Sequence, residues 1–314
     1  MANDIKLISG TSHPDLAREI ADCLGLSLTQ TETVRFGNEN ILFQCNENVR
    51  ESDVFVIQTS CPPVSDGIVE LLIMIDALKH ASARRITAVM PYFPYARSDK
   101  KDRPRISITA RLIADLLETA GADRVLTMNL HSPQVQGFFR IPVDQLDATP
   151  LVCDHLLQAM PLENTVLVAG DVGEAKDLEH YAHRLNLPMA IIDKRRHDDS
   201  EQAVAVGLIG DVDGRDALIV DDEIASGGTL IAAADYLQSQ GAKRIEAAAM
   251  HPVMSGNAKA KLDGSPIGRV VVTNSIPIPA ERRSAKVEVV SIAGLFANAI
   301  GAIHNGSSVS ALFR

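Results

Sequence analysis

The sequence contains no tryptophan, and aromatic residues make up only 4% of its 314 residues. Proteins that hold single-stranded nucleic acid stack the bases on aromatic side chains, so this composition argues against that class. No apolar run approaches the ~18–20 residues that a membrane-spanning helix needs. The first six residues carry an early acid and no apolar stretch typical of a signal peptide. We therefore expect neither a nucleic-acid partner nor a membrane partner.

Cysteine is also scarce, with residues at positions 23, 45, 61 and 153. Their spacing matches no zinc-binding or C-x-x-C pattern, which indicates reduced thiols in a cytoplasmic protein. We expect each of them to act as a small apolar side chain.

The sequence lacks a block rich in Lys and Arg, and its 40 acidic residues outnumber its 30 basic ones, giving a formal charge of −10. Such a chain is a poor candidate for sequence-independent binding to nucleic acid or anionic membranes. Local basic clusters could still hold a small phosphorylated ligand. At ~100–200 residues per domain, the length favours two domains.

Short apolar runs alternate with segments of helical periodicity. This rhythm predicts an α/β fold, with parallel sheets covered by helices on both faces. Strands are expected at residues 5–9, 54–58, 86–90, 125–130, 166–169, 190–192, 217–220 and 245–250, and helices at 14–24, 67–80, 109–120 and 229–240.

Residues 109–131 and 229–251 align with identities at eight of 23 positions. Each copy has a helix, then Gly-Ala-x-Arg, a strand and a histidine, and each glycine stands where a helix end favours positive φ. We interpret this as a duplication that gives two domains of one fold, related as a pseudo-dimer. The alternative is that all such units resemble one another. The expected domains are 1–146 and 147–290, with an apolar helical tail, 291–314, that packs on the first domain.

The most informative segment follows the expected strand 217–220. Asp221 and Asp222 end that strand, and a loop with a Gly-Gly pair then opens a helix. Ligands of open α/β sheets bind at the carboxyl ends of the strands. Exposed backbone N–H groups at a helix start suit a phosphate monoester, with hydroxyl donors from Ser226 and Thr229. The aspartates can accept sugar hydroxyls or hold Mg²⁺. The alternative for Gly-Gly-Thr is a simple helix cap.

The segment VDDEIASGGT resembles the phosphoribosyl-pyrophosphate loop of type I phosphoribosyltransferase folds. Nearly the whole chain is similar to the ribose-phosphate pyrophosphokinase family, which implies two tandem domains of that fold. The supporting segments are 46–63, 71–101, 129–139, 190–196, 209–216, 221–230, 241–245 and 251–258. The resemblance assigns ribose 5-phosphate to Asp221, Asp222, Ala225, Ser226, Gly227, Gly228 and Thr229.

The resemblance implies transfer of the β,γ-diphosphoryl group of ATP to the anomeric hydroxyl of ribose 5-phosphate, with Mg²⁺ as cofactor. The products are phosphoribosyl pyrophosphate and AMP. Two polyanions must meet in this reaction, so cations have to neutralise the transferring group. Lys194 and Arg196 take that catalytic role by resemblance, on a basic segment that fits a mobile loop after a strand. The alternative is a solvated, charged turn.

The resemblance places the ATP site on the first domain. It assigns Phe36, Asn38, Asn40, Arg97, Ser98, Asp99 and His131 to ATP, and His131 together with Asp171 to the metal. Arg97 suits phosphate because its guanidinium is planar and always charged. Taken alone, His131 would be a hydrogen-bonded core residue and Phe36 a core aromatic; by resemblance, Phe36 packs on adenine from a neighbouring subunit.

Departures from the family pattern cluster near ATP. The family usually has carboxylates at Asn38 and Asn40, Gln at Ser98, and Asp at Asn129 and Ala225. Residues 172–177, after Asp171, also lack the usual small, apolar, Gly-Gly character. These changes bear on nucleotide identity, affinity and feedback control more than on the fold.

The family also implies a homo-oligomer, a hexamer with ATP sites shared between subunits. Two other functions stay open. One is a non-catalytic homologue that regulates an authentic synthetase, which the lost carboxylates favour. The other is a phosphoribosyltransferase, against which the doubled architecture and the basic segment 193–196 argue.

Overall fold

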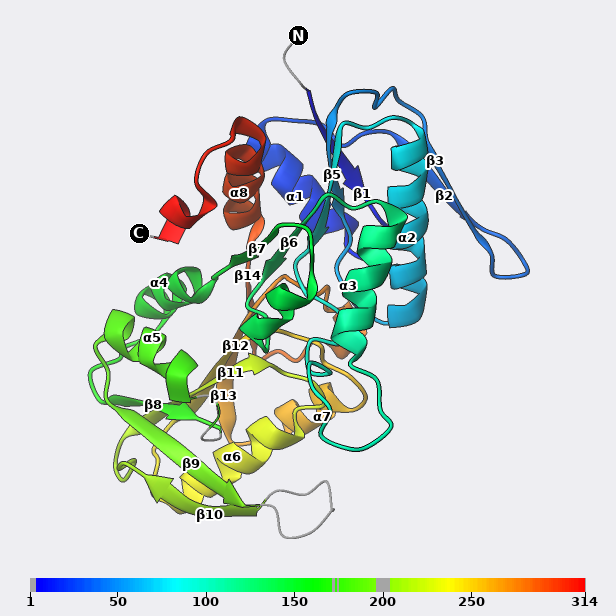
Figure 1. The fold of residues 1–314 in the computed structure, drawn as a ribbon. Helices are drawn as coiled ribbons and strands as arrows, with labels where there is room; N and C mark the ends of the chain where they lie inside the picture. The colour runs from blue at the N-terminus through cyan, green and yellow to red at the C-terminus, as the bar shows by residue number, and fades with distance from the viewer. Residues whose placement is uncertain (1–3, 171–172, 174, 196–203, 314) are drawn as a thin grey trace. The chain divides into compact units, whose positions relative to one another are not determined.

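The computed structural model describes residues 4–170, 173, 175–195 and 204–313 (Figure 1). The chain divides into two compact units. Unit 1 contains Met1–Asp147, Ser275–Pro277 and Ser291–Arg314, and unit 2 contains Ala148–Asn274 and Ile278–Val290. The expected boundaries, 146/147 and 290/291, fall next to these divisions, and we propose that each unit is a folding domain.

Unit 1 is built on a five-stranded parallel sheet in the order β1-β4-β5-β6-β7. All five residues of β4 are buried, which is typical of a strand with helices on both faces. The strands are β1 (Ile5–Ser9), β4 (Asp53–Ile57), β5 (Arg85–Met90), β6 (Arg124–Met128) and β7 (Val143–Leu146). The α/β class with parallel sheets is therefore confirmed.

The helices of unit 1 are amphipathic or largely apolar. In α1 (Pro14–Leu24) the residues Leu16, Ala17, Ile20 and Ala21 are buried, at helical spacing. The C-terminal helix α8 (Ala293–Asn305) packs against α1 (Figure 1). The remaining helices are α2 (Val64–His80) and α3 (Thr109–Ala120), with short 3₁₀ turns at Pro133–Phe138 and Val309–Phe313. A separate antiparallel hairpin, β2 (Thr31–Arg35) and β3 (Ile41–Cys45), was not anticipated.

A buried ion cluster connects α8 to the first residues of strands β4 and β5. The Asp53 side chain has no exposed area, and it accepts hydrogen bonds from Arg85, one of them from Nε at 2.8 Å. The His304 Nδ1 lies 2.9 Å from the same carboxylate. Arg85 also donates to the Ile303 carbonyl at 3.1 Å. These contacts join β4 and β5 to the last turn of α8.

Unit 2 contains a seven-stranded sheet in the order β10-β9-β8-β11-β12-β13-β14. All neighbouring pairs are parallel except β10 and β9. The strands are β8 (Thr165–Ala169), β9 (Met189–Arg195), β10 (Val204–Ile209), β11 (Asp216–Glu223), β12 (Ile245–His251), β13 (Ile267–Thr273) and β14 (Val287–Val290). Its helices are α4 (Thr149–Ala159), α5 (Ala175–Leu185), α6 (Gly228–Ser239) and α7 (Ala258–Asp263).

The aligned repeat has the same local structure in both units. Residues 109–131 contain α3 and β6, and residues 229–251 contain nearly all of α6 and β12. The helix-ending glycines have positive φ, at 118° for Gly121 and 90° for Gly241. The predicted left-handed glycine at both helix ends is therefore confirmed.

The four cysteines differ in their surroundings. All are free thiols, as expected; Cys153 is buried, whereas Cys23 is exposed and is not core filler. Burial raises the pKa of the Cys61 thiol, and the negative charge of Glu70 adds a smaller increase.

Among the described residues, no helix is both long and apolar enough to cross a bilayer.

Candidate functional site

The turn after β11 is the best-defined part of the candidate site. The strand lies centrally in unit 2, between β8 and β12, and it runs to Glu223, three residues beyond the expected end. Asp221 and Asp222 are half-buried at its carboxyl end. Residues 224–227 then lead into α6. The sequence therefore places a carboxylate pair beside a helix start at the sheet edge where α/β ligands bind.

The helix start is open for an anion. Gly227 is the N-cap residue of α6, in the left-handed region with φ 74°, and no side chain caps the helix. The first intrahelical bond runs from the Ile231 N–H to the Gly227 carbonyl at 3.0 Å. The N–H groups before it have no partner within the helix, and Ser226 and Thr229 are exposed. Backbone donors, hydroxyls and the helix dipole together suit a phosphate group.

Residues 251–255 form backbone hydrogen bonds with this turn. The Ile224 N–H donates to the His251 carbonyl, the Met254 N–H to the Ile224 carbonyl and the Ser255 N–H to the Ala225 carbonyl, each at 2.9 Å. Residues 251–255 thus form a backbone ladder with the turn. The family resemblance covers this segment, but sequence reasoning gave it no role, because nothing local in it indicates the pairing.

The candidate ATP segment lies on the connection between β5 and α3. Arg97 is exposed and Asp99 half-buried. The Ser98 Oγ accepts from the Thr109 N–H at 3.3 Å and lies 3.3 Å from the Thr109 Oγ1. The Ala110 N–H also donates to the Ser98 carbonyl at 3.2 Å. Ser98 therefore fastens the connection to the first turn of α3, between the two charged residues assigned to ATP.

The candidate metal residues are placed only in part. His131 follows β6 and is exposed, so the core interpretation of this residue was wrong. Asp171 lies outside the described residues. Within the described ranges, no group of three or more His, Cys, Asp or Glu side chains is arranged to hold a metal. Mg²⁺ prefers oxygen ligands and usually keeps waters and substrate phosphates. The carboxylate pair Asp221 and Asp222 fits such an ion.

Residues 36–40 form the tip of the β2–β3 hairpin. The Phe36 N–H donates to the Asn40 carbonyl at 2.9 Å, and the Asn38 Oδ1 accepts from the Asn40 N–H at 3.2 Å. Phe36 is 48% exposed. The interpretation of Phe36 as a core aromatic was therefore wrong. The hairpin presents this ring and both asparagines to solvent within unit 1.

The basic segment begins on a strand. We expected residues 193–196 to follow a short strand, but β9 continues to Arg195 because β10 pairs with it antiparallel, with Ala205 opposite Lys194. The Lys194 backbone is described and its side chain is not. Arg196 lies outside the described residues.

Comparisons with known proteins identify the family. A model of the N-terminal domain of ribose phosphate pyrophosphokinase matches residues 5–121, and a model of the phosphoribosyl synthetase-associated domain matches 202–314. Ribose-phosphate pyrophosphokinases from Clostridium acetobutylicum and Caldanaerobacter subterraneus are 46% and 48% identical to this chain, each match covering 99% of this chain and 98% of the relative. The chain belongs to the ribose-phosphate pyrophosphokinase family. A crystal structure of phosphoribosylpyrophosphate synthetase from Mycobacterium smegmatis covers 97% of this pyrophosphokinase-family chain and 100% of its own, at 39% identity, with a TM-score of 0.91.

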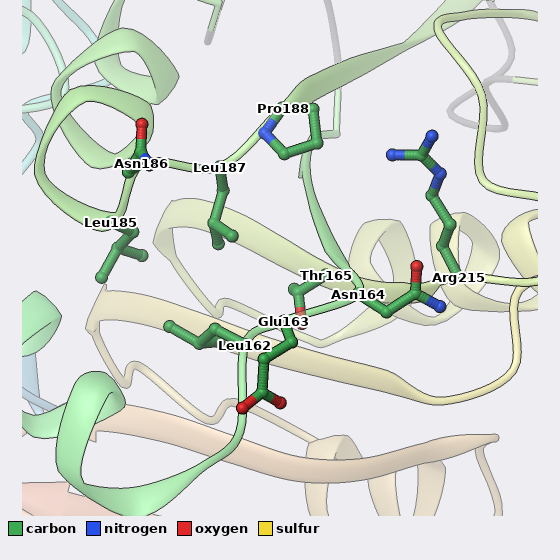
Figure 2. A pocket seen from close by; sticks show the side chains of 9 residues that line it. All are labelled: Leu162, Glu163, Asn164, Thr165, Leu185, Asn186, Leu187, Pro188 and Arg215. Carbon is green, nitrogen blue, oxygen red and sulfur yellow. The ribbon is translucent and has the colours of Figure 1, made fainter.

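A cavity of about 310 Å³ lies elsewhere in this member of the pyrophosphokinase family (Figure 2). It sits where β8 begins and α5 ends, at the amino edge of the unit 2 sheet. The turn 224–229 is at the opposite, carboxyl edge. The lining residues are Leu162, Glu163, Asn164, Thr165, Leu185, Asn186, Leu187, Pro188 and Arg215. None of the predicted site residues lines it.

Gly227 offers a direct test of the turn in this pyrophosphokinase-family protein. Replacing Gly227 with alanine should lower the free energy of unfolding by about 1–2 kcal/mol, because a side chain disfavours the left-handed region. A Cβ there would lie 3.6 Å from the nearest atom, so the cost comes from the backbone conformation and not from a clash. Urea unfolding measures it. Gly264→Ala is the control, since Gly264 has φ −86°; equal losses in both variants would contradict the assigned strain.

Proposed function

We propose that this protein transfers the β,γ-diphosphoryl group of ATP to the anomeric hydroxyl of ribose 5-phosphate, forming phosphoribosyl pyrophosphate and AMP. Membership of the ribose-phosphate pyrophosphokinase family supports the activity. The structural observation that carries the proposal is the open helix start at Gly228, which the short loop 224–227 joins to the strand end with the half-buried pair Asp221 and Asp222. This arrangement supplies phosphate donors and sugar-hydroxyl acceptors within one turn.

Each assigned residue has a chemical role in this proposal. The turn binds the 5-phosphate through its N–H groups and through Ser226 and Thr229. Lys194 and Arg196 stabilise the charge that spreads over the transferring group. Arg97 and Asp99 bind the nucleotide. Ser98 positions these two residues through its hydrogen bond with the first residue of α3.

We propose Mg²⁺ as the cofactor: by the family resemblance His131 and Asp171 would hold it, and the half-buried carboxylates Asp221 and Asp222 offer oxygen ligands within unit 2. When bound, the ion neutralises charge on the phosphates. His131 is exposed and accessible for this role. The chain's own cations, above all Lys194, supply the remaining positive charge.

We propose that the protein acts in the cytoplasm as a homo-oligomer, a hexamer with shared ATP sites. The support within unit 1 is the aromatic ring of Phe36, which stands 48% exposed on the tip of a hairpin. A ring in that place is suited to a nucleotide bound by a second copy of the chain.

The deciding experiment is incubation of the pure protein with Mg–ATP and ribose 5-phosphate. We expect release of AMP that requires both substrates, measured by chromatography. Failure to release the matching nucleoside monophosphate from any nucleoside triphosphate would refute the proposal. Activation of a separate synthetase by the inert protein would then support a regulatory homologue, and consumption of phosphoribosyl pyrophosphate with a nucleobase would support a phosphoribosyltransferase.

A further inference from the structure

The phosphate-binding turn has an unfavourable local charge. Residues 224–229 contain no cation, and the acids Asp221, Asp222 and Glu223 come directly before them. A phosphate monoester has a second pKa near 6 and carries nearly two negative charges at neutral pH. Helix N–H groups contribute only about half an elementary charge. A further cation at the turn would balance the ligand.

Lys261 lies beside that turn. Its Nζ donates to the Ser226 carbonyl at 3.2 Å, from helix α7. A Cβ built on Gly228 would lie 3.9 Å from the same Nζ. The ammonium group therefore stands next to the first residue of α6, where the N–H groups of the turn are open.

The packing of α7 fixes the helix from which Lys261 reaches the turn. Ala258, the first residue of α7, is buried, and its Cα and Cβ lie 4.0 Å from where a Cβ of Gly227 would be. The backbone ladder from Met254 and Ser255 holds the preceding segment to the turn. A lysine on α7 is thus carried at a set distance from the phosphate donors.

Lys261 also keeps its charge available. Among the described residues, no carboxylate lies within ion-pair distance of its Nζ, whereas Lys259 on the same helix pairs with Asp263 at 2.9 Å. Lys261 is exposed, so its flexible stem can swing from the Ser226 carbonyl to a bound phosphate.

We propose that Lys261 is a binding residue for the 5-phosphate of the sugar substrate, and that it completes the cradle formed by residues 225–229. This inference rests on the proposed function, since it takes ribose 5-phosphate as the ligand of the turn. It adds a cation from a different element, 35 residues further along the chain than Ser226.

The test is calorimetric titration of ribose 5-phosphate into the full-length protein with Mg²⁺ and a non-hydrolysable ATP analogue. Lys261→Met should raise the dissociation constant about tenfold or more, the scale of one charge-assisted hydrogen bond. Lys261→Gln keeps a hydrogen-bond donor for the Ser226 carbonyl but no charge, and it should bind as weakly as Lys261→Met. The matched control, Lys259→Met, should bind like the wild type. Added salt should weaken binding more in the wild type than in Lys261→Met.

The outcomes distinguish a failure of the Lys261 inference from a failure of the proposed function. Wild-type affinity in Lys261→Met would overturn the inference. Wild-type affinity in Lys261→Gln with weak binding in Lys261→Met would also overturn it, because the hydrogen bond to the Ser226 carbonyl, and not the charge, would then be what matters. If the wild type binds the sugar phosphate but releases no AMP from ATP, the proposed function fails and the role of Lys261 stands. If the wild type binds no ribose 5-phosphate, both fail. Thermal unfolding of each variant checks that α7 remains folded.

Discussion

Replacing Lys194 with alanine should lower kcat for AMP release by ~10²–10³-fold, the loss expected when one donor to the transition-state charge is removed. The lysine stands near the end of β9. That strand is next to β8, which is next to β11, so its carboxyl end and the turn 224–229, the proposed phosphate site, share one edge of the unit 2 sheet. In the proposed reaction, the transferring group lies between the two substrates in the transition state, with negative charge spread over its oxygens. A cation that contacts this group stabilises the transition state more than it stabilises the bound substrates.

The kinetic pattern distinguishes this role from simple binding. The KM values for both substrates should change little in Lys194→Ala while kcat falls, because the interaction is made mainly in the transition state. Lys243→Ala is the matched control: Lys243 is an exposed cation of the same unit, and its loss should leave kcat unchanged. A kcat for Lys194→Ala within a factor of two of the wild type would refute the assignment.

Replacing Asp53 with asparagine should lower the free energy of unfolding by about 3–5 kcal/mol, the usual cost of removing one partner from a buried ion pair. The neutral amide would leave Arg85 and His304 without the fully buried carboxylate that both contact. The matched control is Asp66→Asn, whose partner Arg35 lies in an exposed pair with both side chains more than 40% accessible. That change should cost ~0–1 kcal/mol. Urea unfolding measures both; similar losses would contradict a structural role for the cluster.

The same cluster predicts a pH dependence. Burial alone would raise the pKa of Asp53, but hydrogen bonds and charge from Arg85 and His304 outweigh it and hold the pKa below its ordinary value. The folded state therefore favours the ionised carboxylate. Its stabilisation is complete above the unfolded-state pKa of about 3.9 and is lost as the pH falls through the lower, folded-state pKa. Below pH 5, the free energy of unfolding should fall more steeply with decreasing pH in the wild type than in Asp53→Asn.

The sequence predicted those parts of the fold whose signal is local. Strands such as β4 are buried on both faces, and a continuous apolar run marks them without any knowledge of their neighbours. The hairpin strands β2 and β3 were missed because their residues are only partly buried or exposed, with Phe43 alone buried, so no continuous apolar run marks them. The end of β9 was misplaced because its extension depends on pairing with β10, a tertiary contact.

The candidate site divides in the same way. The Asp-Asp and Gly-Gly turn was predicted because adjacent residues carry its chemistry. Lys261 was not, because its relation to Ser226 depends on how α7 packs, and a lysine in a short polar helix carries no signal of its own. The exposure of Phe36 likewise follows from the hairpin and not from residue type. The roles of all the assigned site residues stay predictions, and Arg196 and Asp171 also lie outside the described residues.

The division of the chain into units has a consequence for biosynthesis. Unit 1 includes Ser291–Arg314, whereas unit 2 ends at Val290. A ribosome therefore releases every residue of the later unit before the earlier one has its final helix. Until then the surface of α1 that α8 covers is open to water. Nascent chains halted before residue 291 should therefore leave this surface of α1 uncovered.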